Sequence, residues 1–129
     1  TTNGYSHNYV KDAMSNYVYL GYSRVMVDST GPTSTAYGGG TDIWLNYQSL
    51  YISGYSDAHS GEHATSYCFT TTQNPSSCSW QQNSTLPPVT TQTNATYHAY
   101  IRDALGNTTY LGSQNVMVDK TLPSYVKKV

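Results

Sequence analysis

Residues 59 to 63, HSGEH, match H-x-x-E-H, a pattern in which two histidines on one helix face bind zinc beside a catalytic glutamate. The neighbouring residues disfavour that helix, because Gly61 lies inside the segment and Asp57 and Ser60 favour turns. Glu62 is also the only glutamate of the chain, so the downstream glutamate ligand of such proteases is missing. The sequence therefore predicts an exposed loop here and no metal ion.

Other catalytic arrangements lack a sequence signal. Serine, histidine and aspartate are all present, but no G-x-S-x-G turn places a nucleophile, and residues 38 to 40, GGG, precede neither a lysine nor a helix that could cradle phosphate. Four dispersed aspartates are better explained as turn residues than as calcium ligands: Asp28, Asp57, Asp103 and Asp119. We therefore expect a non-enzymatic protein with no cofactor and no metal.

Cys68 and Cys78 are ten positions apart, around a turn-forming stretch that can bring the two sulfurs together. We interpret them as a disulfide, which for a loop of this size stabilises by about 3 kcal/mol. A disulfide indicates an oxidising, extracellular location. The alternative is a pair of free, small apolar residues, and the spacing is not that of a metal site.

Three N-x-S/T sequons make Asn83, Asn94 and Asn107 candidate glycosylation sites. Asn83 has the most loop-like surroundings, whereas Asn107 is also explained by a turn.

Composition limits the class of protein. The chain has 129 residues, of which 10% are charged, and its formal net charge is −1. It therefore lacks the basic field that binds nucleic acid, and no apolar run approaches the roughly 20 residues that cross a bilayer, so no membrane insertion of this segment is expected. Its 14 tyrosines, among many Ser, Thr, Asn and Gln residues, favour pleated sheets. The sequence predicts an all-β protein.

An internal repeat organises the chain. Residues 11 to 32 return without gaps as residues 102 to 123, so that Asp12 matches Asp103, 91 positions later. The period is close to the roughly 100 residues of one small β-sandwich. The chain therefore holds one whole unit and the last part of another.

Alternating apolar and polar residues between turn signals predict short strands and no helix. The repeat supplies two strand pairs, at residues 4–11 with 17–28 and 95–102 with 109–119. Five further strands are expected between them, at residues 41–47, 49–55, 64–70, 79–82 and 89–93.

Several turn motifs, in this order and spacing, resemble those of bacterial immunoglobulin-like repeats from secreted surface proteins. Residues 28 to 32, DSTGP, are similar to the family's D-x-T-x-P junction, and Trp44 followed by Asn46, Asp57 and Ser60-Gly61 to its W-x-N…D-x-x-S-G segment. Residues 103 to 107, DALGN, are similar to its D-x-x-G-N turn, and residues 118 to 123 to the next junction. The resemblance implies an immunoglobulin-like antiparallel β-sandwich. The first copy departs from it at Ser15, where the family has glycine, and the insert between the cysteines lies outside the family pattern.

The resemblance and the repeat together predict three parts: a strand pair at 1–31 equivalent to the last two strands of a preceding repeat, a sandwich at 32–123 and a connector at 124–129. Two strands alone are marginal in water, so residues 1–31 must pair with another segment. That segment belongs either to a tandem repeat or to a neighbouring copy that exchanges strands. The residues expected to take part are Tyr5, Tyr9, Tyr19, Val25 and Val27.

The expected function is that of an extracellular structural module in a bacterial surface fibre, stalk, adhesin or filament, whose partners are identical or homologous units. The alternative is a carbohydrate-binding module that stacks sugars on tyrosines, Trp44 or Trp80.

Overall fold

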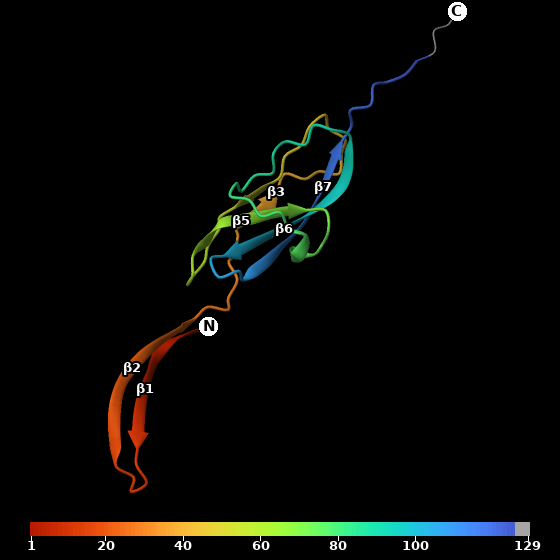
Figure 1. Ribbon diagram of the computed structural model, residues 1–129. Coiled ribbons are helices and arrows are strands. Elements are labelled where there is room, and N and C mark those ends of the chain that lie inside the picture. Colours follow the sequence, from red (N-terminus) through yellow and green to blue (C-terminus); the bar gives the residue numbers. More distant parts are fainter. Residues whose placement is uncertain (126–129) are drawn as a thin grey trace, which may run out of the picture. The chain divides into compact units, whose positions relative to one another are not determined.

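The computed structural model describes residues 1 to 125, and residues 126 to 129 of the expected connector lie outside this range. It divides the chain into two compact units, Thr1–Thr30 and Gly31–Val129. The strands in order are β1 (Thr2–Lys11), β2 (Tyr17–Val27), β3 (Ala36–Gly38), β4 (Tyr51–Ser53), β5 (Glu62–Thr70), β6 (Thr93–Asp103) and β7 (Thr108–Val118), shown in Figure 1. All pairings between them are antiparallel, which confirms the prediction of an all-β fold.

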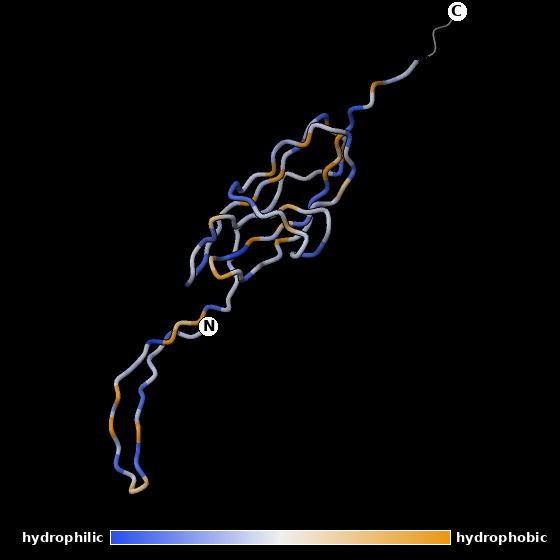
Figure 2. Tube along the Cα trace, viewed as in Figure 1, coloured by the Kyte–Doolittle hydropathy of each residue, from blue (hydrophilic) through white to orange (hydrophobic). Residues whose placement is uncertain are grey.

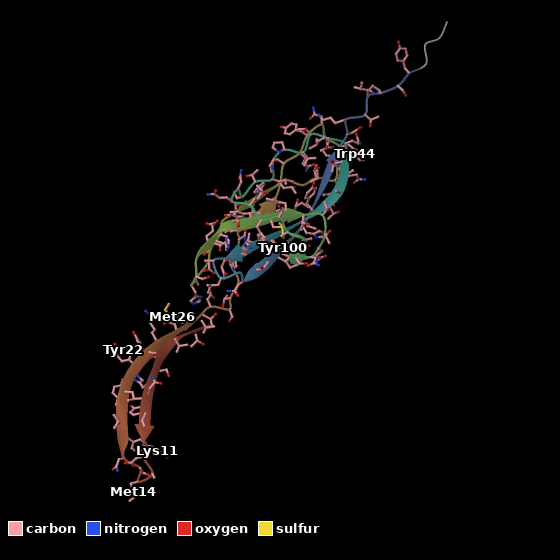
Figure 3. The ribbon with its side chains drawn as sticks, in the orientation of Figure 1. Lys11, Met14, Tyr22, Met26, Trp44 and Tyr100 are labelled. Atoms are coloured by element: carbon pink, nitrogen blue, oxygen red, sulfur yellow. A yellow bond between two sulfur atoms is a disulfide. The ribbon has the colours of Figure 1, made fainter. Side chains whose placement is uncertain are left out.

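The first unit is a single hairpin of β1 and β2. Lys11 and Met14 lie near its tip, and Tyr22 and Met26 lie along β2 (Figure 3). Hydrophobic stretches occur along both strands, as they do within the second unit (Figure 2). No second layer covers this hairpin within its own unit, so most of its side chains are exposed.

The second unit is a sandwich of two sheets, β3–β4 and β5–β6–β7. Ile52 of β4 packs between the sheets against Tyr67, Ala99 and Ile101. A second cluster joins Leu50 to Val116 and Val118 of β7. Ala99 and Ile101 of β6, with Val116 and Val118 of β7, are buried on the same face of this strand pair, because alternate side chains of a strand share a face.

Three predicted strands are wrong. Residues 41–47, 79–82 and 89–93 form only isolated bridges at Leu45, Gln81 and Val89, apart from Thr93, which begins β6. Three glycines directly precede residues 41–47 and two prolines directly precede residues 89–93, and these shorten both segments, since proline cannot donate to a ladder and glycine favours turns. Conversely, β3 and a single 3-10 turn at Pro75–Ser77 were not predicted.

The expected disulfide between Cys68 and Cys78 is present, with a Cα–Cα distance of 5.7 Å. It ties β5 to the end of the loop that contains the 3-10 turn. Cys68 is fully buried, so the bridge is part of the core of the second unit.

Replacing both cysteines with serine is expected to lower the free energy of unfolding of the second unit by about 3 kcal/mol, because the unfolded chain regains the freedom of the loop. Urea unfolding followed by tryptophan fluorescence measures this, since Trp44 and Trp80 both belong to the second unit. Adding a reductant to the unmodified chain should give the same loss. An unchanged midpoint in both experiments would contradict the prediction.

Candidate functional site

The two hairpins have the same pairing, residue by residue. Thr2 pairs with Val27 in the first hairpin, and the equivalent Thr93 pairs with Val118 in the second. The register of each shifts at the same place, after Asn8 in the first and after Ala99 in the second. The β1–β2 hairpin therefore has the same strand register and the same β-bulge as β6–β7.

The turns of the two hairpins are held by equivalent aspartates. Asp103 accepts hydrogen bonds at 2.9 Å from the backbone N–H groups of Leu105 and Asn107, and at 2.6 Å from the Asn107 side-chain amide. Asp12 accepts the matching three bonds, from Met14 and Asn16, at 2.9–3.0 Å. The turn therefore forms the same way whether it is buried or exposed.

Hydrogen bonding lowers the pKa of both carboxyl groups. For Asp103, burial by itself raises the pKa, but the bonds from the Asn107 side chain and from the Asn107 and Leu105 backbones outweigh it. For Asp12, the side-chain bond from Asn16 is the largest cause of the lowered pKa. Both side chains are thus held as carboxylates that fix their turns.

The turns differ at one residue with a positive φ. Gly106 has φ 90° in the second hairpin, and Ser15 occupies the equivalent place with φ 64°. A left-handed conformation is easy for glycine and costs other residues about 1–2 kcal/mol. The turn of the first hairpin is therefore the weaker one.

Accordingly, Gly106→Ser is expected to destabilise the second unit by about 1 kcal/mol. Ser15→Gly should leave that unit unchanged and raise the hydrogen-exchange protection of the first turn. Urea unfolding measures the first effect and exchange the second. Equal stability of the Gly106→Ser variant and the unmodified chain would contradict this account.

The largest difference between the hairpins is the burial of one face. We call inner face the side of the first hairpin that carries Val10, Val18, Leu20, Val25 and Val27. Val10 is 54% exposed and Val25 40% exposed, whereas their equivalents Ile101 and Val116 are completely buried. The inner face thus presents core-type residues to solvent, in two apolar groups, Val10 with Val18 and Leu20, and Val25 with Val27, which are separated by Ser6, Asn8 and Ser23.

The edges of the hairpins differ as well. In the second unit, β5 pairs with β6, and the backbone N–H of Leu45 donates to the Met117 carbonyl of β7 at 3.0 Å. The backbone N–H of Thr41 donates likewise to the Asn115 carbonyl at 3.0 Å. Within its own unit, the first hairpin has β1 and β2 alone, so both outer edges lack a strand partner. Open edges beside an apolar face are a template for strand pairing.

Aromatic side chains occupy the opposite face of the first hairpin. We call outer face the side formed by Tyr5, His7, Tyr9, Tyr19 and Tyr22. The centres of neighbouring rings on it lie 5.1–6.0 Å apart. Tyr5, His7 and Tyr22 line a shallow depression of about 220 Å³. The His7 Nδ1 atom lies 2.9 Å from the Tyr19 hydroxyl, as His98 Nδ1 lies 2.8 Å from the Tyr110 hydroxyl.

The residues predicted to take part in assembly therefore separate into two groups. Val25 and Val27 lie on the inner face, and Tyr5, Tyr9 and Tyr19 lie on the outer face. The prediction omitted Val10, Val18 and Leu20. Their match to Ile101, Thr109 and Leu111 in the repeat was the available signal, because Ile101 and Leu111 belong to the core of the second unit.

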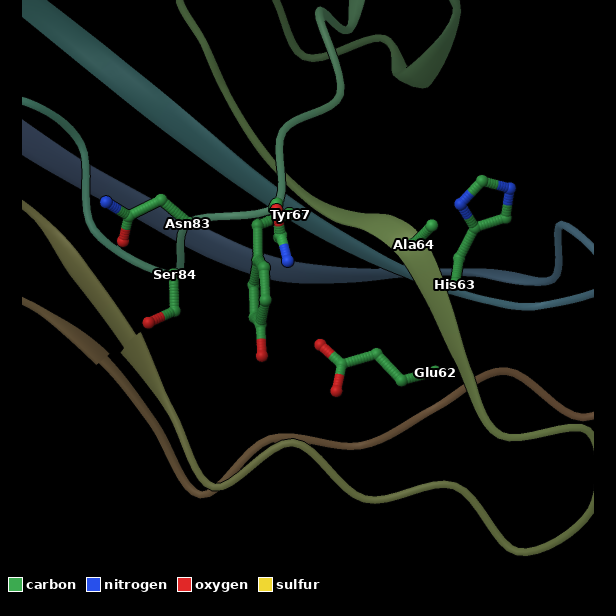
Figure 4. A pocket seen from close by; sticks show the side chains of 7 residues that line it. Glu62, His63, Ala64, Tyr67, Asn83 and Ser84 are labelled. Carbon is green, nitrogen blue, oxygen red and sulfur yellow. The ribbon is translucent and has the colours of Figure 1, made fainter.

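The HSGEH segment forms a loop and the start of a strand, not a helix, and Glu62 is the first residue of β5. Asp57 accepts hydrogen bonds from the backbone N–H groups of His59 at 3.2 Å and Gly61 at 2.6 Å. In Figure 4 the Glu62 carboxylate points toward the Tyr67 hydroxyl, while His63 lies apart from them. Burial, together with the hydrogen bond to Glu62, raises the pKa of Tyr67.

This region forms a polar hollow of about 450 Å³ that also includes Asn83 and Ser84. Glu62 is engaged in a 2.7 Å hydrogen bond from the Ser66 hydroxyl, and His63 Nδ1 accepts from the Thr65 backbone at 3.0 Å. Glu62, His63 and Tyr67 therefore make these bonds within their own strand, β5.

The three sequons lie in different surroundings. Asn83 and Asn94 are exposed, and Asn83 Oδ1 accepts from the Thr85 backbone N–H at 3.1 Å. The side-chain nitrogen of Asn107 donates to Asp103. Since an N-glycan attaches to that nitrogen, Asn107 is the least suited of the three to glycosylation.

The two tryptophans of the second unit lie in different surroundings. Trp44 is 49% exposed, whereas the guanidinium carbon of Arg102 lies 4.5 Å from the centre of the Trp80 ring. Arg102 also donates to the Thr65 carbonyl at 2.8 Å. Trp80 therefore stacks on Arg102 of β6.

No family model matches the chain, and neither a curated protein nor a solved structure matches it. Residues 1 to 125 contain no helix with the length and apolar character needed to span a membrane.

Proposed function

We propose that the chain is an extracellular structural module, of immunoglobulin-like type, from a bacterial surface fibre, stalk, adhesin or filament that is built of successive units. The observation that carries the proposal is the first hairpin, which repeats the register, bulge and turn of β6–β7 while exposing the inner face. When the last two strands of a unit occur again just before it in the sequence, the chain has the organisation of a tandem array. The disulfide supports a location outside the cytoplasm.

Labelling of intact producing cells with an antibody against the second unit tests this proposal. Signal on unpermeabilised cells, removed by brief protease treatment, is the expected result, and electron microscopy of the released protein should show a row of similar units. Signal that requires permeabilisation would contradict it.

A second candidate is carbohydrate binding by the outer face of the first hairpin. It is favoured by the row of rings, because Tyr5 and Tyr22 replace the smaller Thr96 and Ser113 of the second hairpin, and aromatic rings stack on sugars. A glycan array tests it. Binding that is lost when Tyr5→Thr and Tyr22→Ser are combined would support it, and no binding to any glycan would exclude it.

A further inference from the structure

The covering of β6–β7 in the second unit comes from residues 31–91, which we call the cover segment. Leu50 and Ile52 of this segment contact the buried face of β6–β7, and β5 and Leu45 close its two edges. Since the first hairpin has the same register and apolar inner face, a segment of the same kind fits it. That segment is either identical to residues 31–91 or related to them.

Two side chains that meet the cover segment differ between the hairpins. Tyr97 packs against the cluster of Leu50, Val116 and Val118 in the second unit, and its equivalent in the first hairpin is Ser6. Ala99 is completely buried, and its equivalent is Asn8. An identical cover segment on the first hairpin would therefore leave a cavity the size of a tyrosine side chain beside Ser6. It would also bury the Asn8 amide without a hydrogen-bond partner.

Two hydrogen bonds to the cover segment are also specific to the second hairpin. Gln114 Oε1 accepts from the Gly40 N–H at 3.1 Å, but the equivalent residue is the shorter Ser23. Thr109 donates its hydroxyl to the Pro32 carbonyl at 2.6 Å, but the equivalent Val18 has no hydroxyl. The apolar residues common to both hairpins thus keep the general fit, while these positions distinguish one cover segment from another.

We propose that the inner face of the first hairpin binds a cover segment that is related to residues 31–91 but not identical to them, supplied by a preceding repeat of the same polypeptide. This proposal rests on the proposed function. It adds that the units of the array follow one another in a fixed order, because their cover segments are not interchangeable. It identifies the partner of the inner face as a segment with a bulkier side chain opposite Ser6 and a hydrogen-bonding group opposite Asn8.

Stoichiometry favours a preceding repeat over a second copy of this chain. Within residues 1 to 125, each copy has two hairpins of one register and one cover segment, which its own β6–β7 already occupies. Copies alone would always leave one hairpin per chain uncovered. A linked segment also acts at a high effective concentration, and Thr1, the equivalent of Gln92, would follow directly on the equivalent of Thr91.

The test is a chain in which residues 31–91 are joined directly before Thr1, with residues 1–129 unchanged; we call it the extended chain. Hydrogen exchange of β1–β2 peptides is compared with that of β6–β7, which serves as an internal standard for a covered hairpin. In the extended chain, the double variant Ser6→Tyr, Asn8→Ala should exchange its β1–β2 amides about a hundredfold more slowly than the extended chain without these changes. Its exchange rate in β1–β2 should then be close to that in β6–β7.

The matched control combines Tyr5→Thr with Tyr22→Ser in the extended chain. These changes also replace two residues by their β6–β7 equivalents, but on the outer face. These two changes should leave exchange of β1–β2 unaltered. Full protection with Ser6 and Asn8 unmodified would overturn the proposal, because an identical cover segment would then suffice. Lack of protection with both inner-face changes would overturn it too, because the inner face would not be a docking surface for this kind of segment. Neither result alters the cell-labelling test, so the two proposals can fail separately.

Discussion

Ile101→Ala is expected to lower the free energy of unfolding of the second unit by about 4 kcal/mol, because it removes three carbons from a completely buried side chain and leaves a cavity. Ile101 lies in one buried cluster with Ile52 and Tyr67, and the neighbours of such a cavity relax only partly to fill it. The loss is a large share of the stability of a domain of this size.

The repeat offers a matched control for this variant. Val10 occupies the equivalent place on the first hairpin but is 54% exposed, so Val10→Ala should change unfolding of the second unit by less than about 0.5 kcal/mol. Urea unfolding monitored by tryptophan fluorescence reports both, since both tryptophans lie in the second unit. Similar losses in the two variants would show that the first hairpin is already packed in the isolated chain.

Asp103→Ala is expected to lower the free energy of unfolding of the second unit by about 4 kcal/mol. The substitution removes three hydrogen bonds to a fully buried carboxylate and leaves their donors without that partner. The matched variant Asp12→Ala breaks the same bonds in the exposed hairpin. It should leave unfolding of the second unit unchanged and raise hydrogen exchange in the first turn only.

The pH dependence of stability should follow from the same contacts. Because the folded-state pKa of Asp103 lies below its ordinary value of 3.8, its stabilising contribution is complete above that value and is lost as the pH falls through the lowered pKa. Between pH 5 and strongly acidic pH, roughly 2, the unmodified chain should therefore lose more stability than Asp103→Ala. Parallel losses in both proteins would contradict the assigned role of Asp103.

Several features could be predicted from the sequence because they repeat or have strong local signals. The match of Asp12 to Asp103 indicated two equivalent hairpins, and the alternation along them gave the all-β class. The turn between Cys68 and Cys78 indicated the disulfide. These features depend on residues that are close in sequence or copied within it.

Other features depend on contacts between distant segments and carried no such signal. The bridges at Leu45, Gln81 and Val89 involve one residue each, so a strand-like pattern around them overstated their pairing. The division of the first hairpin into an apolar inner face and an aromatic outer face required the register with its bulge, which the sequence does not reveal. The difference between Ser6 and its equivalent Tyr97 could be interpreted only once the neighbours of Tyr97 were known.

Hydrogen exchange of the unmodified 129-residue chain, at a concentration where sizing shows monomers, is the most direct test of the central claim that the first hairpin is an uncovered equivalent of β6–β7. The expected result is that β1–β2 peptides exchange at least about a hundredfold faster than β6–β7 peptides, because a hairpin without a second layer is marginally stable. Equally slow exchange of the two hairpins in the monomer would contradict the claim.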